Sequence, residues 1–261
     1  GVGALVAQKL FDKLNVEWTG LFCESDGSFP NHHPDPTVVA NLQDLIAKVR
    51  STGADLGVAF DGDADRIGVV DEHGSIVWGD HVLILYARDV LERTGAGQPI
   101  IFDVKCSQAL PDEILKAHGE PVMWKTGHSL MKDKMREVNA PVAGEMSGHM
   151  FFTEGFYGHD DALYGAARLI RIVAASDTSL SGMLADVPKF VSTPELRVDV
   201  DESRKFQIVD DAIRHFRETH EVIDVDGARV LFGDGWGVIR ASNTHPVLVL
   251  RFEARSAERL A

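Results

Sequence analysis

The sequence predicts two consecutive α/β domains with mixed, largely parallel sheets, followed by a small α+β domain with an antiparallel sheet. Two observations predict this fold class. Short apolar strands alternate with helices of about 10 to 15 residues through the middle of the chain, which is typical of βαβ units. Near the end, several short strands instead follow one another directly, which indicates an antiparallel sheet.

The chain opens on an amphipathic helix. Apolar residues recur there at helical spacing: Val2, Leu5, Val6, Leu10 and Leu14. In an α/β unit a strand should precede such a helix, and no strand or signal peptide precedes this one. The last residues, 256–261, read as the start of another helix, so we expect a chain that is cut at both ends.

The middle of the chain alternates strands with helices. The expected strands are 56–60, 67–70, 75–78, 100–105, 121–125, 141–146 and 150–154. The expected helices are 81–93, 109–118, 129–138 and 160–176. A turn at 71–74 makes a hairpin of the second and third strands.

The pattern changes near Pro188. A strand at 195–200 and a helix at 204–219 lead into four short strands, at 221–225, 228–232, 236–240 and 246–254. We therefore expect three domains: an N-terminally incomplete 1–75, then 76–188 and 189–261.

Composition excludes several classes of protein. The formal net charge of −14 argues against a nucleic-acid-binding protein, because affinity for a phosphate backbone needs clustered Lys and Arg. No apolar run reaches the roughly 18 to 20 residues of a membrane span. The two cysteines, Cys23 and Cys106, form no CxxC pair. We expect a cytoplasmic, disulfide-free monomer.

An acidic loop follows the apolar strand 56–60 and predicts a metal site. Asp61, Asp63 and Asp65 alternate within five residues, so their oxygens can converge on a hard divalent cation. A calcium EF-hand loop is disfavoured because Arg66 occupies the position that needs glycine. A solvated acidic turn is the plain structural alternative. Mg²⁺ is favoured over calcium because three carboxylates leave room for a phosphate oxygen and water.

Two further polar segments suit a phosphorylated sugar. Glu145 and Ser147 lie two residues apart, so an extended backbone points both the same way, towards vicinal hydroxyls; a buried polar turn is the alternative. His149 follows, with a pKa suited to general acid/base chemistry or to a structural role. The third segment contains Arg240, Ser242, Asn243 and Thr244, whose cation, hydroxyls and amide can bind a dianionic phosphate. A plain turn is the alternative.

Together these segments resemble motifs of the α-D-phosphohexomutase superfamily, in its bacterial phosphomannomutase/phosphoglucomutase branch. DGDADR (61–66) is similar to the family's DGDGDR metal loop, with Ala64 where the family often has Gly. GEMSGH (144–149) resembles its sugar-recognition loop and RASNTHP (240–246) its phosphate-binding loop. The resemblance implies that Arg66 reaches the transferred phosphate, and that Lys105 and His128 line the cleft and hold phosphate and sugar. It also implies that NHHPDP (31–36) is a rigid connector.

The resemblance implies reversible phosphoryl transfer between O1 and O6 of glucose or mannose phosphates. The implied agents are Mg²⁺, a phosphoserine, and a glucose or mannose 1,6-bisphosphate intermediate. The family's phosphoserine loop, TASHNP-like, does not occur in this sequence. We therefore expect the chain to lack an N-terminal domain and to be inactive alone. The alternative is a non-catalytic phosphosugar-binding or regulatory protein that reuses the fold.

Overall fold

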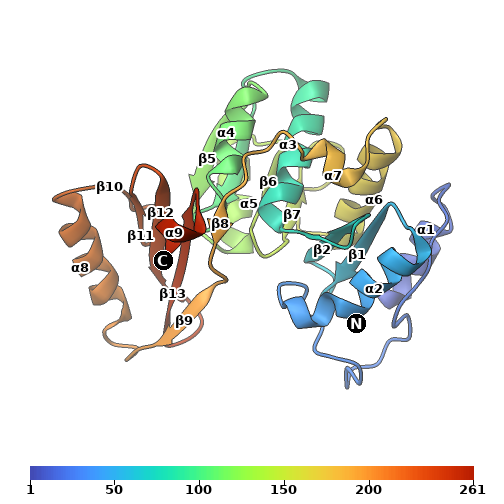
Figure 1. The fold of residues 1–261 in the computed structure, drawn as a ribbon, viewed down its shortest axis with the longest axis horizontal. Helices are drawn as coiled ribbons and strands as arrows, with labels where there is room; N and C mark the ends of the chain where they lie inside the picture. Colours follow the sequence, from blue (N-terminus) through green and yellow to red (C-terminus); the bar gives the residue numbers. More distant parts are fainter.

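Three β-sheets organise the chain, and their order along the sequence confirms the predicted fold class (Figure 1). The computed structural model describes all residues, 1–261. In Figure 1 the three sheets follow one another across the view, from the N-terminal part through the middle to the C-terminal part. None of the helices combines the length and apolar character needed to cross a bilayer.

The first sheet contains β1 (Leu56–Phe60), β2 (Ile67–Asp71) and β3 (Ile76–Val77), paired in that order. The predicted hairpin is confirmed, but the expectation of a largely parallel sheet is wrong here, because both pairings are antiparallel. The links of a few residues between these strands are too short for a parallel crossover, which needs about a dozen residues or more. The helices that precede this sheet are α1 (Ala4–Phe11), η1 (Val39–Leu42) and α2 (Gln43–Thr52).

The second sheet has the order β5-β4-β6-β7. Its strands are β4 (Pro99–Asp103), β5 (Glu120–Trp124), β6 (Val142–Gly144) and β7 (Met150–Phe152). β4 pairs parallel with β5 and β6, while β7 returns antiparallel along β6. The associated helices are α3 (Gly79–Thr94), α4 (Ala109–Lys116), α5 (His128–Val138), α6 (Ala162–Ala174) and α7 (Leu180–Met183).

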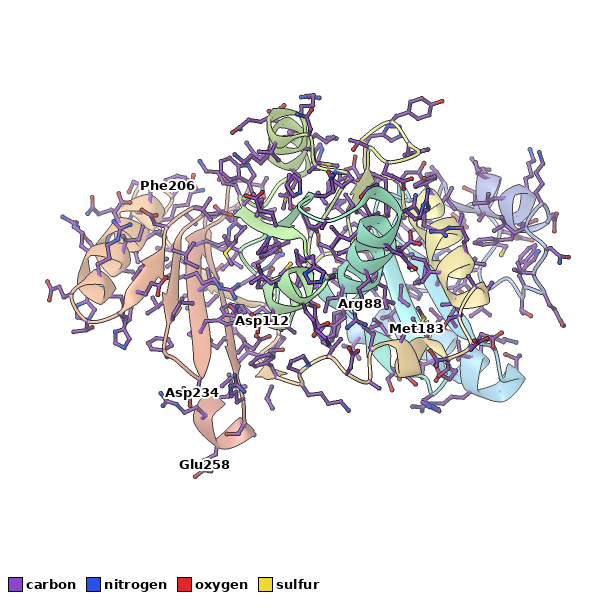
Figure 2. The ribbon with its side chains drawn as sticks, turned by 90° about the horizontal axis from the view of Figure 1, so that it is seen from above. Arg88, Asp112, Met183, Phe206, Asp234 and Glu258 are labelled. Atoms are coloured by element: carbon purple, nitrogen blue, oxygen red, sulfur yellow. The ribbon has the colours of Figure 1, made fainter.

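The third sheet is wholly antiparallel and has the order β10-β11-β12-β13-β8, with β9 also paired to β13. Its strands are β8 (Val191–Ser192), β9 (Leu196–Asp199), β10 (Glu221–Ile223), β11 (Ala228–Leu231), β12 (Gly235–Ala241) and β13 (Val247–Ala254). Helix α8 (Lys205–Arg217) lies against β10, β11 and β12, and α9 (Ala257–Leu260) follows β13. In Figure 2, Phe206 marks α8 on the side of this part that faces away from the middle of the molecule.

One hydrophobic core of 27 buried residues spans the first two sheets. Helix α3 lies at its centre and buries most of its length, from Val82 to Leu91, against both sheets. The α1 helix contributes Phe11 to this core, whereas its residues Leu5 and Val6 are exposed. The predicted apolar face of the first helix is therefore only partly buried in this structure.

The second and third sheets meet through a smaller contact. Its apolar part has three buried residues: Val104, Trp236 and Val238. Partly buried Met123, Val225 and Leu231 pack around these three residues, and buried polar and charged side chains complete the contact. The chain that leads from the second sheet to the third passes through α7, which is held on α3. Arg88 of α3 donates a hydrogen bond to the Met183 carbonyl of α7 at 2.8 Å, and the two residues lie close together in Figure 2.

Candidate active site

The acidic loop forms the tight link between β1 and β2. Asp61 is 3% exposed and organises the loop, since its Oδ1 accepts the backbone N–H groups of Asp65 and Arg66, each at 3.0 Å. Its Oδ2 accepts the Arg66 Nε–H at 2.7 Å. Burial raises the pKa of Asp61, but the hydrogen bonds from Arg66 outweigh it and hold that pKa below its usual value. Asp61 therefore stays ionised.

The predicted metal ligands come together in this loop. Carboxylate oxygens of Asp61, Asp63 and Asp65 all lie within 4.8 Å of one another. Oδ1 of Asp65 is buried and has no hydrogen-bond partner. Burial raises the pKa of Asp65 to about 6, against the nearby charge of His149. A buried carboxylate oxygen that accepts no hydrogen bond, beside two further carboxylates, fits a hard divalent cation, so these residues suit Mg²⁺.

Ala64 holds the loop in a left-handed backbone conformation, with φ of +62°. This conformation explains why a related loop would carry glycine at this place, since L side chains are disfavoured there. The Ala64 carbonyl also accepts the N–H of Ala162 at 3.1 Å, which ties the loop to the start of α6.

We expect Ala64→Val to lower the free energy of unfolding by about 1–3 kcal/mol, because a β-branched side chain at positive φ is strained. Ala64→Gly is the matched control and should change it by less than about 1 kcal/mol, since relief of φ strain offsets the loss of one buried methyl group. Urea unfolding of both variants measures the difference. Equal stability of the two variants would contradict the positive φ.

The segment 144–149 connects β6 to β7 and lies directly against the acidic loop. Ile67 N–H donates to the Gly148 carbonyl at 3.0 Å, and Arg66 forms a backbone bridge with His149. Gly148 has φ of +100°, and a Cβ there would lie 2.4 Å from the Ile67 carbonyl oxygen. Close packing of the two loops therefore requires this glycine.

Glu145 and His149 form a buried ion pair, with Glu145 Oε2 2.6 Å from His149 Nδ1. Burial opposes the charge on both groups. The hydrogen bond between them outweighs that effect, so the pKa of Glu145 is lowered and that of His149 is raised. The Ser147 hydroxyl lies 3.2 Å from the same His149 nitrogen, and His149 Nε2 lies 3.3 Å from Asp65 Oδ1.

Glu145 differs from the expectation of a carboxylate directed at sugar hydroxyls. It is 2% exposed, and its other oxygen accepts the Gly127 N–H at 2.5 Å. Both carboxylate oxygens are therefore engaged within the protein. The reason is that the 144–149 loop turns back on itself, which an extended segment with alternating side chains would not do.

His128 begins α5 and lies at the rim of the same site. It is more than half exposed, its ring centroid is 6.4 Å from that of His149, and its Nδ1 is 3.8 Å from Asp160 Oδ2. Asp160 was not predicted from the sequence, yet with Asp65 and His149 it forms a second group of potential metal ligands. Its salt bridge with Lys132, at 3.1 Å, helps to keep its pKa low despite burial.

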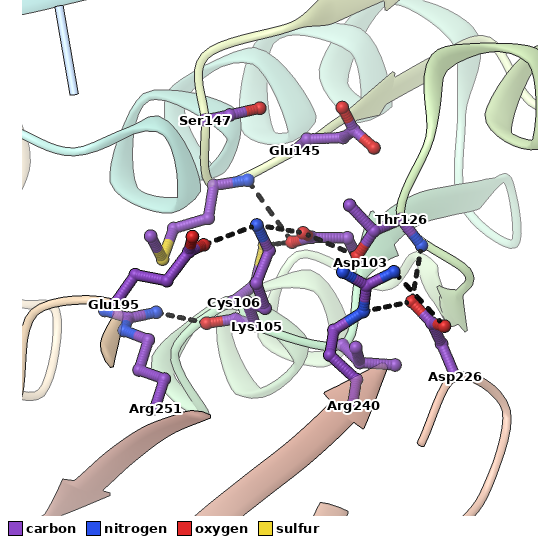
Figure 3. Close-up of polar contacts among 12 residues, drawn as sticks. Asp103, Lys105, Cys106, Thr126, Glu145, Ser147, Glu195, Asp226, Arg240 and Arg251 are labelled. Carbon is purple, nitrogen blue, oxygen red and sulfur yellow. Dashed lines mark hydrogen bonds and ion pairs between the residues drawn. The ribbon is translucent and has the colours of Figure 1, made fainter. Parts of the chain in front are cut away.

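Lys105 lies just after the carboxyl end of β4 and is buried, with 6% of its surface exposed; Figure 3 shows its neighbours. Its ammonium is 3.0 Å from Glu195 and 3.7 Å from Asp103. Burial lowers the pKa of Lys105, but the neighbouring carboxylates outweigh it and raise that pKa. The fully buried Asp103 also accepts the Met146 N–H at 3.2 Å, which joins β4 to the loop that carries Glu145.

The predicted phosphate loop connects β12 and β13. The Ser242 hydroxyl oxygen accepts the N–H groups of Thr244 and His245, at 3.3 and 3.2 Å, so it shapes the turn. Asn243 and Thr244 are exposed at its tip. Buried Lys205 donates to the Ser242 carbonyl at 2.7 Å and holds the loop from behind.

Arg240 is buried below this loop and paired with a residue that the sequence did not indicate. Its Nε donates to Asp226 Oδ2 at 2.9 Å, and the same oxygen accepts the Thr126 N–H at 3.0 Å (Figure 3). The Thr126 hydroxyl donates to Asp103 at 3.3 Å. A continuous polar chain therefore links Arg240 to the Lys105 region.

The structure thus brings most of the predicted residues into two groups, and within each group the residues are linked by contacts. One contains the metal loop and the sugar loop: Asp61, Asp63, Asp65, Arg66, Glu145, Ser147 and His149. The other joins Lys105 to Arg240. No contact connects Asn243 or Thr244 to the metal loop in this structure.

Three family models match successive parts of the chain. Residues 1–74 match phosphoglucomutase/phosphomannomutase α/β/α domain II, residues 78–190 match domain III, and residues 195–261 match the C-terminal domain.

Similar proteins carry related names. The chain is 52% identical, over 258 residues, to a phosphomannomutase/phosphoglucomutase of Pseudomonas putida, covering 98% of this chain and 55% of that protein. It is 51% identical over 257 residues to a phosphoglucomutase of Neisseria gonorrhoeae, covering 97% and 55%. A crystal structure of a phosphoglucomutase/phosphomannomutase family protein from Burkholderia thailandensis superimposes with a TM-score of 0.90 at 48% identity, covering 100% and 56%. The chain therefore spans about half the length of the relatives it matches.

Proposed function

Because the chain belongs to the phosphoglucomutase/phosphomannomutase family, we propose that it is the metal-, sugar- and phosphate-binding part of a phosphohexomutase. The reaction is reversible transfer of phosphate between O1 and O6 of glucose or mannose phosphates, which places the enzyme in the isomerase class. The observation that carries the proposal is the direct joining of the acidic loop to the 144–149 loop through the Arg66–His149 bridge. A charged phosphoryl group and a sugar hydroxyl can therefore meet in one place.

In this proposal the acidic loop binds Mg²⁺, which neutralises charge on the phosphoryl group when bound. Asp61, Asp63 and Asp65 are the ligands. Arg66, whose Nε is held by Asp61 and whose Nη1 lies 3.4 Å from Asp35, binds the transferred phosphate through its free N–H groups.

His149 acts as the general acid/base. It removes the proton from the attacking sugar hydroxyl as the new oxygen–phosphorus bond forms, while the bond from phosphorus to its previous oxygen breaks. Glu145 fixes the ring orientation by binding Nδ1, so Nε2, which lies 3.3 Å from Asp65 Oδ1, faces the acidic loop and is the nitrogen that exchanges the proton. Glu145 and Ser147 bind ring hydroxyls. For this, Glu145 gives up its hydrogen bond from the Gly127 N–H and accepts one from the sugar instead.

The non-reacting phosphate is held by the C-terminal loop in this proposal. Arg240, Ser242, Asn243 and Thr244 grip it, while Lys105 and His128 line the cleft between the two groups. Phosphate is supplied by a phosphoserine in an N-terminal domain of the same protein, through a glucose or mannose 1,6-bisphosphate. We also propose domain limits of 1–75, 76–188 and 189–261, and a monomeric cytoplasmic enzyme.

The test compares the full-length protein with residues 1–261 on glucose 1-phosphate and mannose 1-phosphate. We expect the full-length protein to form the 6-phosphates in the presence of Mg²⁺, and the fragment to show no activity above background. Turnover by the fragment would disprove its dependence on the missing domain. A full-length protein that binds these sugars without converting them would favour a regulatory, non-catalytic role.

We further expect Arg240→Ala to weaken binding of glucose 6-phosphate to the fragment by about tenfold or more, since a charge-assisted hydrogen bond contributes roughly 1.5–3 kcal/mol. Isothermal titration calorimetry measures both affinities. Arg214→Ala is the control, because Arg214 is exposed on α8 and paired only with Asp211. Equal affinities of the Arg240→Ala variant and the parent would show that this loop is a turn without a binding role.

A further inference from the structure

Three consecutive backbone carbonyls after β4 accept hydrogen bonds from two arginines of the C-terminal sheet. Nη1 of Arg229, on β11, donates to the carbonyls of Val104 and Cys106, at 2.7 and 2.8 Å. Nη1 of Arg251, on β13, donates to the carbonyl of Lys105 between them (Figure 3). The carbonyls of Lys105 and of both its neighbours are therefore bound by side chains from another sheet.

Arg229 has no counter-ion to explain its burial. It is 0% exposed, and no carboxylate lies within 4.0 Å of its guanidinium, which lies 3.7 Å from the centre of the Trp236 ring. Burial lowers its pKa to about 10. Burying a cation without a counter-ion is unfavourable, and the hydrogen-bond acceptors that compensate this one are the two carbonyls and Gln108 Oε1, the latter at 3.3 Å.

The segment held in this way carries the Lys105 ammonium. That ammonium lies between Asp103 and Glu195, beneath the loop of Glu145 and Ser147 (Figure 3). A shift of the Lys105 backbone would move the ammonium away from the site, because its side chain is almost fully buried and cannot compensate by changing rotamer.

We propose that Arg229 and Arg251 are positioning residues, which place Lys105 for the phosphosugar only when the C-terminal sheet is docked on β4. This inference rests on the proposed function and adds a role for two residues outside the three motifs. Docking of the C-terminal domain and placement of a substrate-binding cation are then one event.

A double-mutant cycle in the full-length protein tests this role. Arg229→Met and Lys105→Met should each lower kcat/KM for glucose 1-phosphate by about tenfold or more, mainly by raising KM. The double variant should be no worse than Lys105→Met alone, because Arg229 acts through Lys105. Arg255→Met is the control: Arg255 is exposed just after β13, lies over Phe190, and should leave kcat/KM unchanged.

The outcomes separate the two hypotheses. If the losses add in the double variant, or if Arg229→Met is harmless while Lys105→Met is damaging, this inference is wrong. An inactive wild-type protein, or a harmless Lys105→Met, would overturn the proposed function and this inference with it. If Arg229→Met does not fold, Arg229→Lys replaces it in the cycle. This variant keeps the charge, so we expect a smaller loss of kcat/KM, again no larger in the double variant than in Lys105→Met alone. Additive losses would again refute the inference.

Discussion

Replacing Asp63 with Asn should lower the mutase kcat of the full-length protein by about a hundredfold or more, because a charged metal ligand supplies several kcal/mol of transition-state stabilisation. Among Asp61, Asp63 and Asp65, Asp63 gives the clearest test of the metal site. It is exposed and makes no hydrogen bond or salt bridge within the protein, whereas Asp61 holds the loop together. The substitution should therefore leave the melting temperature unchanged.

The measurement is the rate of glucose 6-phosphate formation as a function of Mg²⁺ concentration. Asp177→Asn, another exposed aspartate far from the acidic loop in sequence, is the control and should behave as wild type. Near wild-type activity of the Asp63→Asn variant at saturating Mg²⁺ would remove Asp63 from the metal site.

The second large effect concerns His149. We expect His149→Gln to lower kcat by about 10²–10⁴-fold with little change in KM, the range that general acid/base catalysis contributes. His159→Gln is the control, because His159 is exposed and stacks only on neighbouring aromatic rings. A loss of less than about threefold in the His149→Gln variant would assign this histidine a structural role.

The pKa of His149 adds a pH test of the same role. Because the Glu145 pair raises that pKa above 6.5, a general base at this position is increasingly protonated, and inactive, as the pH falls through its raised pKa. The rate should fall on the acid side accordingly. Glu145→Gln removes the stabilising charge and should move that midpoint to lower pH. An unchanged midpoint would exclude His149 as the group that controls the profile.

The parts of the site that the sequence predicted are local in the chain. The acidic loop, the 144–149 loop and the 240–246 loop each concentrate their polar groups within a few residues, and the structure places each in a turn between strands. The partners of these loops are not local. Asp226 meets Thr126 across 100 residues of sequence, and Glu195 meets Lys105 across 90. Neither carboxylate lies in a recognisable pattern, so only the three-dimensional structure reveals it.

The fold shows the same division. The strand 56–60 and the 67–78 hairpin were predicted correctly because short apolar runs bounded by turn residues are a strong local signal. Helix α2 (Gln43–Thr52) was missed, although Leu45, Ile46 and Val49 have helical spacing. The antiparallel pairing in the first sheet follows from the short links between its strands, whereas the alternation of strands and helices along the middle of the chain indicated parallel pairing.

The unequal contacts among the three sheets have a consequence for cooperativity of unfolding. The first two sheets share one continuous hydrophobic core, so denaturant should unfold them in a single transition. The third sheet is joined to them by a much smaller apolar cluster, with three buried residues, and by hydrogen bonds of Arg229 and Arg251 that water can replace once the sheet has separated. The amide protons of the third sheet should therefore exchange with deuterium through a separate opening of lower free energy. We expect two cooperative unfolding units, although the molecule has three sheets.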